Sequence, residues 1–310
     1  MVARSYNGDG ALSLGGRIAY LAQNRINNRA PYEHLDPGLS IADLDVREST
    51  RLDELPGLPS PSRALCDLFW MYLPWDAIEQ EVGPLRILDV GCGTGRYGVT
   101  LQAWSGARVA RYLGIDRDPH TDWPRLTARH PYLAFCRGDA QAIGDLVPVD
   151  TNIFISQSTL EHVEDDISCL DQIHDYAHHY GRPMLSIHLI PSQACLWTYL
   201  WHGYRQYTPR TLSARTRRFA DCSERLLVRL GGTACNALHY RFITWPLLIL
   251  RRGDRRDTEP VRYREALRQA IIRDMRAPQP SAAFYALLIH SYARRSLGGA
   301  GSWRIRTRGK

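Results

Sequence analysis

A glycine-rich segment offers the clearest chemistry in this sequence. Gly91, Gly93 and Gly95 alternate with other residues soon after Asp89, which lies at the end of a short apolar run. Glycine allows a sharp turn from strand to helix and lets the backbone approach a ligand without a Cβ clash. The spacing therefore predicts a turn, with Cys92 inside it, that binds part of a ligand through backbone atoms.

Three further polar residues stand at the ends of later apolar runs. Asp116 follows residues 111–115, Asp139 follows residues 133–136 after Gly138, and Gln157 follows residues 152–156. Ligands of open α/β sheets bind outside the carboxyl ends of the strands, so these side chains are expected to converge with Asp89. A carboxylate there can accept two hydrogen bonds from a vicinal diol. A single aspartate at a strand end is more often a turn or cap, so the prediction depends on the ordered set.

Short apolar runs and amphipathic stretches alternate from residue 84 onward. Strands are expected at residues 86–90, 111–115, 133–136, 152–156, 183–189, 226–229 and 283–292, with helices at 97–104 and 165–179. This alternation predicts βαβ units. We expect an α/β fold: a Rossmann-like, doubly wound, mostly parallel sheet with helices on both faces, in a domain spanning residues 84–310.

Two flanking regions complete the expected organisation. Residues 1–83 are predicted to form an N-terminal extension, helical at about 18–25, and a role as lid or dimer arm is left open. The proline-rich residues 55–62 look like a linker, after which Ser62 would cap a helix over 63–73. Thr208 is a candidate cap for a helix from Pro209. A basic, largely helical insertion is expected at about 245–280.

These motifs resemble those of the class I S-adenosylmethionine-dependent methyltransferases of the general small-molecule type, over about residues 84–190. The resemblance implies S-adenosylmethionine as cofactor. Asp116 would hold the ribose hydroxyls, Asp139 the adenine amino group, and Gln157 would lie under the sulfonium. The residues implied to bind the cofactor are Asp89, Gly91, Cys92, Gly93, Gly95, Asp116, Arg117, Asp139, Ala140 and Gln157.

Two histidines are candidates for removing a proton from an acceptor hydroxyl. His162 follows the fourth predicted strand and His188 lies near the end of the fifth. Histidine is the natural general base near neutral pH. The alternatives are that His162 holds the local turn and that His188 is a buried, hydrogen-bonded residue.

The acceptor-binding segment is expected at about residues 190–210, which are dense in aromatic and hydrogen-bonding side chains. Its candidate substrate-binding residues are His202, Tyr204, Arg205 and Tyr207. Such side chains are suited to stacking on a ring or to binding hydroxyl and anionic groups. An aromatic helix packed on the sheet would give the same sequence pattern. The leading hypothesis is an O-methyltransferase acting on a small molecule or saccharide, such as a glycan or natural-product precursor.

Charge is distributed unevenly along the chain. Residues 201–310 carry 23 basic and 7 acidic side chains, whereas residues 1–200 carry 16 basic and 25 acidic ones, and Lys310 is the single lysine. A cationic third can attract an anionic substrate, so a methyltransferase of RNA or another polyanion is the alternative hypothesis. A solvated basic face would give the same pattern.

No metal site is expected from the sequence. The seven cysteines stand singly without a Cys-x-x-Cys pair, which indicates reduced, mostly buried thiols. The acidic residues Glu161, Glu164, Asp165 and Asp166 read as a solvated helix start. No apolar stretch is long enough for a membrane span and no signal peptide is recognised, so a cytoplasmic protein is expected. A homodimer is left open.

Overall fold

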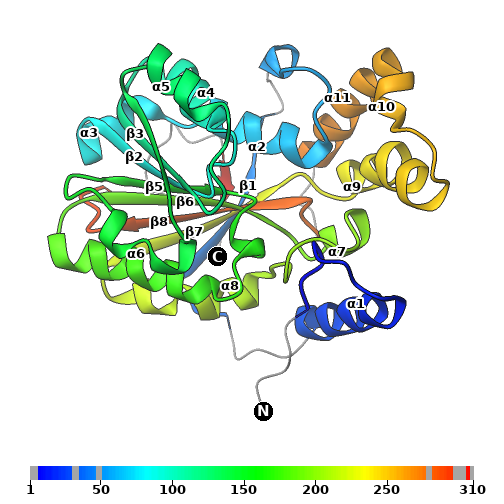
Figure 1. Ribbon diagram of the computed structural model, residues 1–310, viewed down its shortest axis with the longest axis horizontal. Helices are drawn as coiled ribbons and strands as arrows, with labels where there is room; N and C mark the ends of the chain where they lie inside the picture. Colours follow the sequence, from blue (N-terminus) through cyan, green and yellow to red (C-terminus); the bar gives the residue numbers. More distant parts are fainter. Residues whose placement is uncertain (1–5, 30–34, 47–50, 277–280, 296–304, 308–310) are drawn as a thin grey trace.

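One nine-stranded mixed sheet runs through the part of the chain that the structure describes, with helices on both faces (Figure 1). The structure is a computed structural model, and it describes residues 6–29, 35–46, 51–276, 281–295 and 305–307. The strands are β1 (Leu39–Leu44), β2 (Leu85–Val90), β3 (Val109–Asp116), β4 (Leu133–Arg137), β5 (Ile153–Gln157), β6 (Met184–Pro191), β7 (Ser223–Leu230), β8 (Phe284–Ser291) and β9 (Ile305–Thr307).

The order of the strands creates a binding crevice. It is β4-β3-β2-β5-β6-β8-β7-β1-β9. Strands β2 to β6 run parallel to one another, whereas β8 is antiparallel to both β6 and β7. The chain steps from β2 outward to β3 and β4, then returns to the other side of β2 for β5. Such a reversal leaves a crevice at the carboxyl ends of the strands, which is where ligands bind in this architecture. The expected Rossmann-like, doubly wound fold is confirmed.

Side chains of the central strands alternate between two apolar cores. In β2, Leu85 and Ile87 join the core beneath one helical layer, and Leu88 and Val90 join the core on the opposite face. This period of two is expected for a strand whose sheet is covered on both sides. Since both faces of the sheet are covered by apolar side chains, polar side chains reach solvent mainly beyond the strand ends.

Helices form a layer on each face of the sheet. In Figure 1, α2, α4, α5, α9 and α11 lie on one side, while α6 and α8 lie on the other. The helices are α1 (Leu14–Arg29), α2 (Pro61–Met71), α3 (Trp75–Val82), α4 (Arg96–Trp104), α5 (Trp123–Arg129), α6 (Asp166–Tyr180), α7 (Cys195–Thr198), α8 (Pro209–Arg215), α9 (Thr233–His239), a π-helix (Tyr240–Ile249), α10 (Arg255–Thr258) and α11 (Pro260–Arg276). The expected basic helical insertion is confirmed, and it lies between β7 and β8.

The start of α2 differs from the prediction. Ser60, not Ser62, caps the helix, because its side-chain oxygen accepts a hydrogen bond of 3.3 Å from the Arg63 N–H. Pro61 then occupies the first helical turn, where its missing N–H costs nothing. Ser62 is buried inside the helix instead. The predicted cap at Thr208 is confirmed, since Thr208 and Thr211 form a reciprocal capping box at the start of α8.

The N-terminal region contributes a strand that the sequence did not predict. β1 lies parallel to β7, with Asp43 paired in register with Arg229. The guanidinium of Arg229 donates two hydrogen bonds of 2.7 and 2.8 Å to the Asp43 carboxylate, and both side chains are almost buried. The division at residue 84 and the role of residues 1–83 as lid or dimer arm stay predictions.

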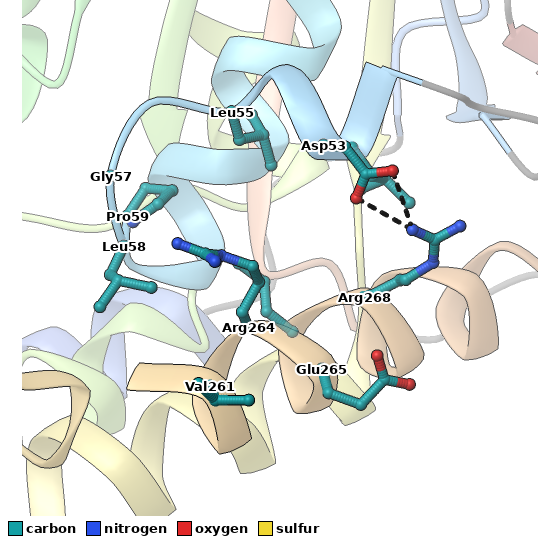
Figure 2. A pocket seen from close by; sticks show the side chains of 11 residues that line it. Asp53, Leu55, Gly57, Leu58, Pro59, Val261, Arg264, Glu265 and Arg268 are labelled. Carbon is teal, nitrogen blue, oxygen red and sulfur yellow. Dashed lines mark hydrogen bonds and ion pairs between the residues drawn. The ribbon is translucent and has the colours of Figure 1, made fainter. Parts of the chain in front are cut away.

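The predicted linker runs across α11 and forms the wall of a surface cavity of about 450 Å³ (Figure 2). The Tyr263 hydroxyl of α11 donates a hydrogen bond of 2.6 Å to the Pro59 carbonyl, and Arg268 forms an exposed ion pair with Asp53. The linker is therefore held between α2 and the basic insertion. No helix among the described residues is long and apolar enough to span a lipid bilayer.

The Asp43–Arg229 pair gives a test of how β1 is held. Replacing Asp43 with Ala leaves a nearly buried guanidinium without its carboxylate, so we expect a loss of about 3 kcal/mol in the free energy of unfolding. Asp53→Ala removes the exposed pair with Arg268 and is expected to cost less than about 1 kcal/mol. Urea unfolding followed by circular dichroism measures both, and equal losses would contradict the structural role of β1.

Candidate cofactor-binding and catalytic site

The glycine turn after β2 requires glycine for two reasons. Gly91, Gly93 and Gly95 have φ of 76°, 52° and 76°, the left-handed region that side chains disfavour. A Cβ at Gly91 would also lie 2.2 Å from Cγ2 of Thr159, a residue of the loop after β5. The Gly91 N–H donates a hydrogen bond of 2.7 Å to the Ile115 carbonyl, which fixes the turn against β3.

Gly95 has a packing role. It forms the N-cap of α4, and a Cβ there would lie 2.4 Å from the ring of Phe135. Neither of the two cavities next to the glycine turn has Gly95 in its wall. The third glycine of the motif therefore lets α4 approach β4.

The first of these cavities, of about 340 Å³, brings several predicted residues together. Gly91, Asp116, Arg117, Asp139, Ala140, His162 and Tyr204 all line it. Asp116 accepts hydrogen bonds from the backbone N–H groups of Gly93 (2.8 Å) and Asp118 (3.1 Å), so its carboxylate is fixed at the cavity wall. Each oxygen keeps a lone pair for a further donor. Asp139 is similarly held by the Gln141 N–H at 2.8 Å.

The second cavity, of about 620 Å³, lies on the other side of the same turn. Asp89, Gly91, Cys92, Gly93 and Gln157 line it, so Gly91 belongs to both cavity walls. Asp89 is buried and accepts a hydrogen bond from the Tyr112 hydroxyl. Burial raises the pKa of the Asp89 carboxyl to about 7. Burial likewise raises the pKa of the Cys92 thiol, which keeps this group neutral.

The second cavity also contains polar residues that the sequence analysis missed. Arg63 of α2 donates a hydrogen bond of 2.7 Å to the Tyr97 hydroxyl, which in turn donates one of 2.6 Å to Asp67. Gln157 is fixed by the same tyrosine and accepts a hydrogen bond of 2.8 Å from Nε1 of Trp70. These contacts join α2, α4 and β5, and no local sequence pattern indicates them.

A cluster of ionisable side chains lies at the edge of the first cavity. Nδ1 of His162 is 2.6 Å from Oδ2 of Asp9, and Nδ1 of His202 is 3.5 Å from Oδ1 of the same carboxylate. The two imidazole rings meet edge to face with centroids 4.6 Å apart. Burial raises the pKa of Asp9, but the Gly203 N–H and His162 outweigh it, so the net pKa is lowered. Asp9 was not among the residues singled out from the sequence.

The prediction that Glu161 belongs to a solvated helix start is wrong. Its side chain is fully buried, and Asp166 is buried as well, whereas Glu164 and Asp165 are exposed as expected. Glu161 lies in a 3-10 turn (Leu160–His162) before α6, so it points inward instead of lying on the helix surface. The pKa of Glu161 is raised to about 8, chiefly by burial and also by the nearby Asp9 carboxylate.

Besides Gly95 and His202, three predicted site residues line neither cavity. His188 is fully buried in β6, where Nδ1 is 2.8 Å from the Ser156 hydroxyl, and burial lowers its pKa to about 4. The buried, hydrogen-bonded alternative is therefore correct for His188, because β6 is covered on both faces. Tyr207 and Arg205 bind the buried carboxylate of Asp166 at 2.8 and 3.0 Å. These two contacts are with the first residue of α6.

A family model and several solved structures resemble parts of this chain. Residues 88–183 match the family model of a methyltransferase domain. A search of curated protein sequences gave no match. Three solved structures, each 14% identical to this chain, are similar to it. An S-adenosylmethionine-dependent methyltransferase from Mesorhizobium loti aligns with a TM-score of 0.39 over 70% of this chain and 95% of its own. The [4+2]-cyclase SpnF aligns with a TM-score of 0.44 over 89% of this chain and 94% of its own, and the plantazolicin methyltransferase BamL with 0.42 over 89% and 98%, respectively. Likenesses of this size do not assign an activity.

The methyltransferase-domain match over residues 88–183 and the glycine turn at the sheet's switch point are consistent with a class I S-adenosylmethionine-dependent methyltransferase. The site fits that cofactor, because Gly91, which has no side chain, forms a cradle in the walls of both cavities and fixed carboxylates line the first cavity. We propose that Asp116 and Asp139 hold its nucleoside in the first cavity. Its amino-acid portion would then lie across the backbone of Gly91 and Gly93, in the second cavity.

Gly91 provides a direct test of this cradle. Gly91→Ala places a methyl group against Thr159 and in the shared cavity wall, so we expect at least a tenfold loss of affinity for S-adenosylmethionine, equal to about 1.4 kcal/mol. Gly106→Ala is the matched control, because Gly106 has a similar φ of 66° but open space around its Cβ. Isothermal titration calorimetry measures both affinities. Unchanged binding by Gly91→Ala would contradict the assigned cradle.

Proposed function

We propose that this methyltransferase transfers the methyl group to a hydroxyl of a small molecule or saccharide. The observation that carries the proposal is the position of His162. Its side chain lines the same cavity as Asp116 and Asp139, and its Nδ1 is held by Asp9. A hydroxyl acceptor must lose its proton during transfer, and an oriented imidazole next to the cofactor site is suited to assist that loss.

The bond changes define what the protein must supply. Bound S-adenosylmethionine supplies a methyl group already activated by the sulfonium. The acceptor oxygen forms a bond to the methyl carbon, the carbon–sulfur bond breaks with its electron pair going to sulfur, and the hydroxyl proton leaves the acceptor. The cluster of Asp9, Glu161, His162 and His202 is the group of side chains that we assign to this proton. Tyr204 lines the cavity beside His162 and is proposed to contact the acceptor with His202.

The charge around the site supports a small acceptor over a polyanion. The first cavity is lined by the carboxylates of Asp116, Asp118, Asp139 and Glu164, against a single arginine, Arg117. A wall of this composition repels a phosphate backbone. The second cavity, of about 620 Å³, has the size typical of small-molecule sites, which is about 300–1,000 Å³.

His162 gives the first test of the proposed reaction. His162→Ala is expected to lower kcat by about 100-fold or more while leaving the affinity for S-adenosylmethionine near that of the unmodified protein. The assay measures S-adenosylhomocysteine formation with a panel of phenols, sugars and amines, and a ¹³C-labelled methyl group identifies the acceptor atom by NMR. His130→Ala, at the far end of α5, is the control. Full activity of His162→Ala, or a label found on nitrogen or carbon, would refute O-transfer assisted by this cluster.

Salt dependence tests the alternative acceptor. A polyanion acceptor bound through phosphates would lose affinity with salt, with a log–log slope of about −0.7 per phosphate for a single strand. We expect no such binding to a short RNA, because many arginines of residues 201–310 are already paired with carboxylates of this chain. Fluorescence anisotropy at two salt concentrations measures it. Tight, salt-sensitive binding together with methylation of the RNA would favour the alternative.

A further inference from the structure

The arrangement of the cluster exceeds what a single catalytic base needs. Nε2 of His162 is 4.0 Å from Oε1 of Glu161, and Nε2 of His202 is 3.9 Å from the same oxygen. One ligand atom from each of the three residues lies within 4.8 Å of the other two. Both imidazoles therefore turn the same nitrogen towards one buried carboxylate.

Asp9 determines which nitrogen faces inward. Because Asp9 lies next to Nδ1 of both histidines, Nε2 of each ring faces Glu161. Neither oxygen of Glu161 has a hydrogen-bond partner at normal distance among the described residues. Two ring nitrogens and a buried carboxyl group without a hydrogen-bond partner thus face one another across distances too long for a hydrogen bond. A cation among them would give all three groups a partner.

We propose that Glu161, His162 and His202 bind a divalent transition-metal ion of the Zn²⁺ type. Two imidazole nitrogens and one carboxylate form a ligand set that zinc uses in catalytic sites, which keep a further position open. Zinc–ligand bonds of about 2.0–2.2 Å would place ligand atoms about 3.4 Å apart in a tetrahedral site. The observed 3.9 and 4.0 Å are slightly wider, and both imidazoles are partly exposed and can rotate inward. The sequence analysis expected no metal, because the three ligands are not spaced as a motif.

The surroundings of the ligands have the features of a built site. Asp9 contacts the outer nitrogen of both histidines, as carboxylates commonly do for metal-bound imidazoles. The Gly203 N–H donates a hydrogen bond of 3.1 Å to Asp9, and the Tyr20 hydroxyl donates one of 2.7 Å to the His202 carbonyl. Gly203, with φ of 61°, lies so close to the Glu161 carbonyl that a Cβ would approach it to 2.6 Å. The three segments that carry Asp9, Glu161 and His202 are therefore fixed next to one another.

The place of the site indicates its use. His162 lines the first cavity, so the open position of the metal would be next to the proposed acceptor. A metal-bound hydroxyl loses its proton more readily than a free one, so with the ion bound His162 would assist the proton loss through the metal and not as the base itself. This role rests on the proposed function, whereas metal binding itself does not depend on which acceptor is methylated.

The experiment measures metal binding by the full chain. Protein treated with a chelator and then dialysed is titrated with Zn²⁺ by calorimetry, and with Co²⁺ by visible absorption. We expect one ion per chain. His162→Ala and His202→Ala should lose it, whereas His130→Ala, which leaves the cluster intact, should bind as the unmodified protein does. Asp9→Asn keeps all three ligands and is expected to bind about 10- to 100-fold more weakly.

The controls separate a failed site from a failed fold or function. Circular dichroism and S-adenosylmethionine titration confirm that each variant is folded. Zn²⁺ binding that is absent, or equal in His162→Ala and the unmodified protein, would overturn the site, and full competition by Mg²⁺ would overturn the transition-metal assignment. A chain that binds Zn²⁺ at these residues but methylates no hydroxyl refutes the proposed acceptor alone. Full hydroxyl methylation by metal-free protein refutes the metal's role alone.

Discussion

The close approach of Gly91 to Thr159 is the constraint on which both cavities depend. The turn after β2 passes so near the loop after β5 that only a hydrogen atom fits between them. The Thr159 hydroxyl also donates a hydrogen bond of 3.3 Å to the Gly91 carbonyl. Thr159 immediately precedes the turn that carries Glu161 and His162. One backbone contact therefore fixes the glycine cradle and the ionisable cluster relative to each other.

Much of the fold could be predicted because its patterns are local. β3 and β5 end in the polar residues Asp116 and Gln157, and both Asp116 and Asp139 stand where the pattern placed them, at one cavity. β1 was missed because its partner β7 lies about 190 residues later, and the Asp43–Arg229 pair that joins them has no local pattern. Strand pairing at that separation is decided by tertiary contacts, which a single sequence does not display.

The candidate site was harder to predict on the acceptor side than on the cofactor side. His188 was expected to face the crevice, but β6 is buried along its whole length, so only residues beyond its end can reach the cavity. Glu161 looked like part of a solvated helix start, yet the 3-10 turn rotates it inward beneath Gly203. Asp9 joins the cluster only because the fold places residues 6–9 next to the loop carrying His202. Each of these placements depends on contacts between distant segments.

The folded structure gives a different explanation for the uneven distribution of charge along the sequence. Arg225, almost fully buried, binds Asp36 at 2.7 Å, and Arg229 binds Asp43, so two basic residues of β7 neutralise acids of the N-terminal region. Arg205 and Arg215 share the buried carboxylate of Asp166. Pairs of this kind join the acidic first two thirds to the basic last third. The excess of arginine after residue 200 is thus used, in these pairs, to hold the chain's own segments together, and charge counts along a sequence cannot distinguish that use from attraction of an external polyanion.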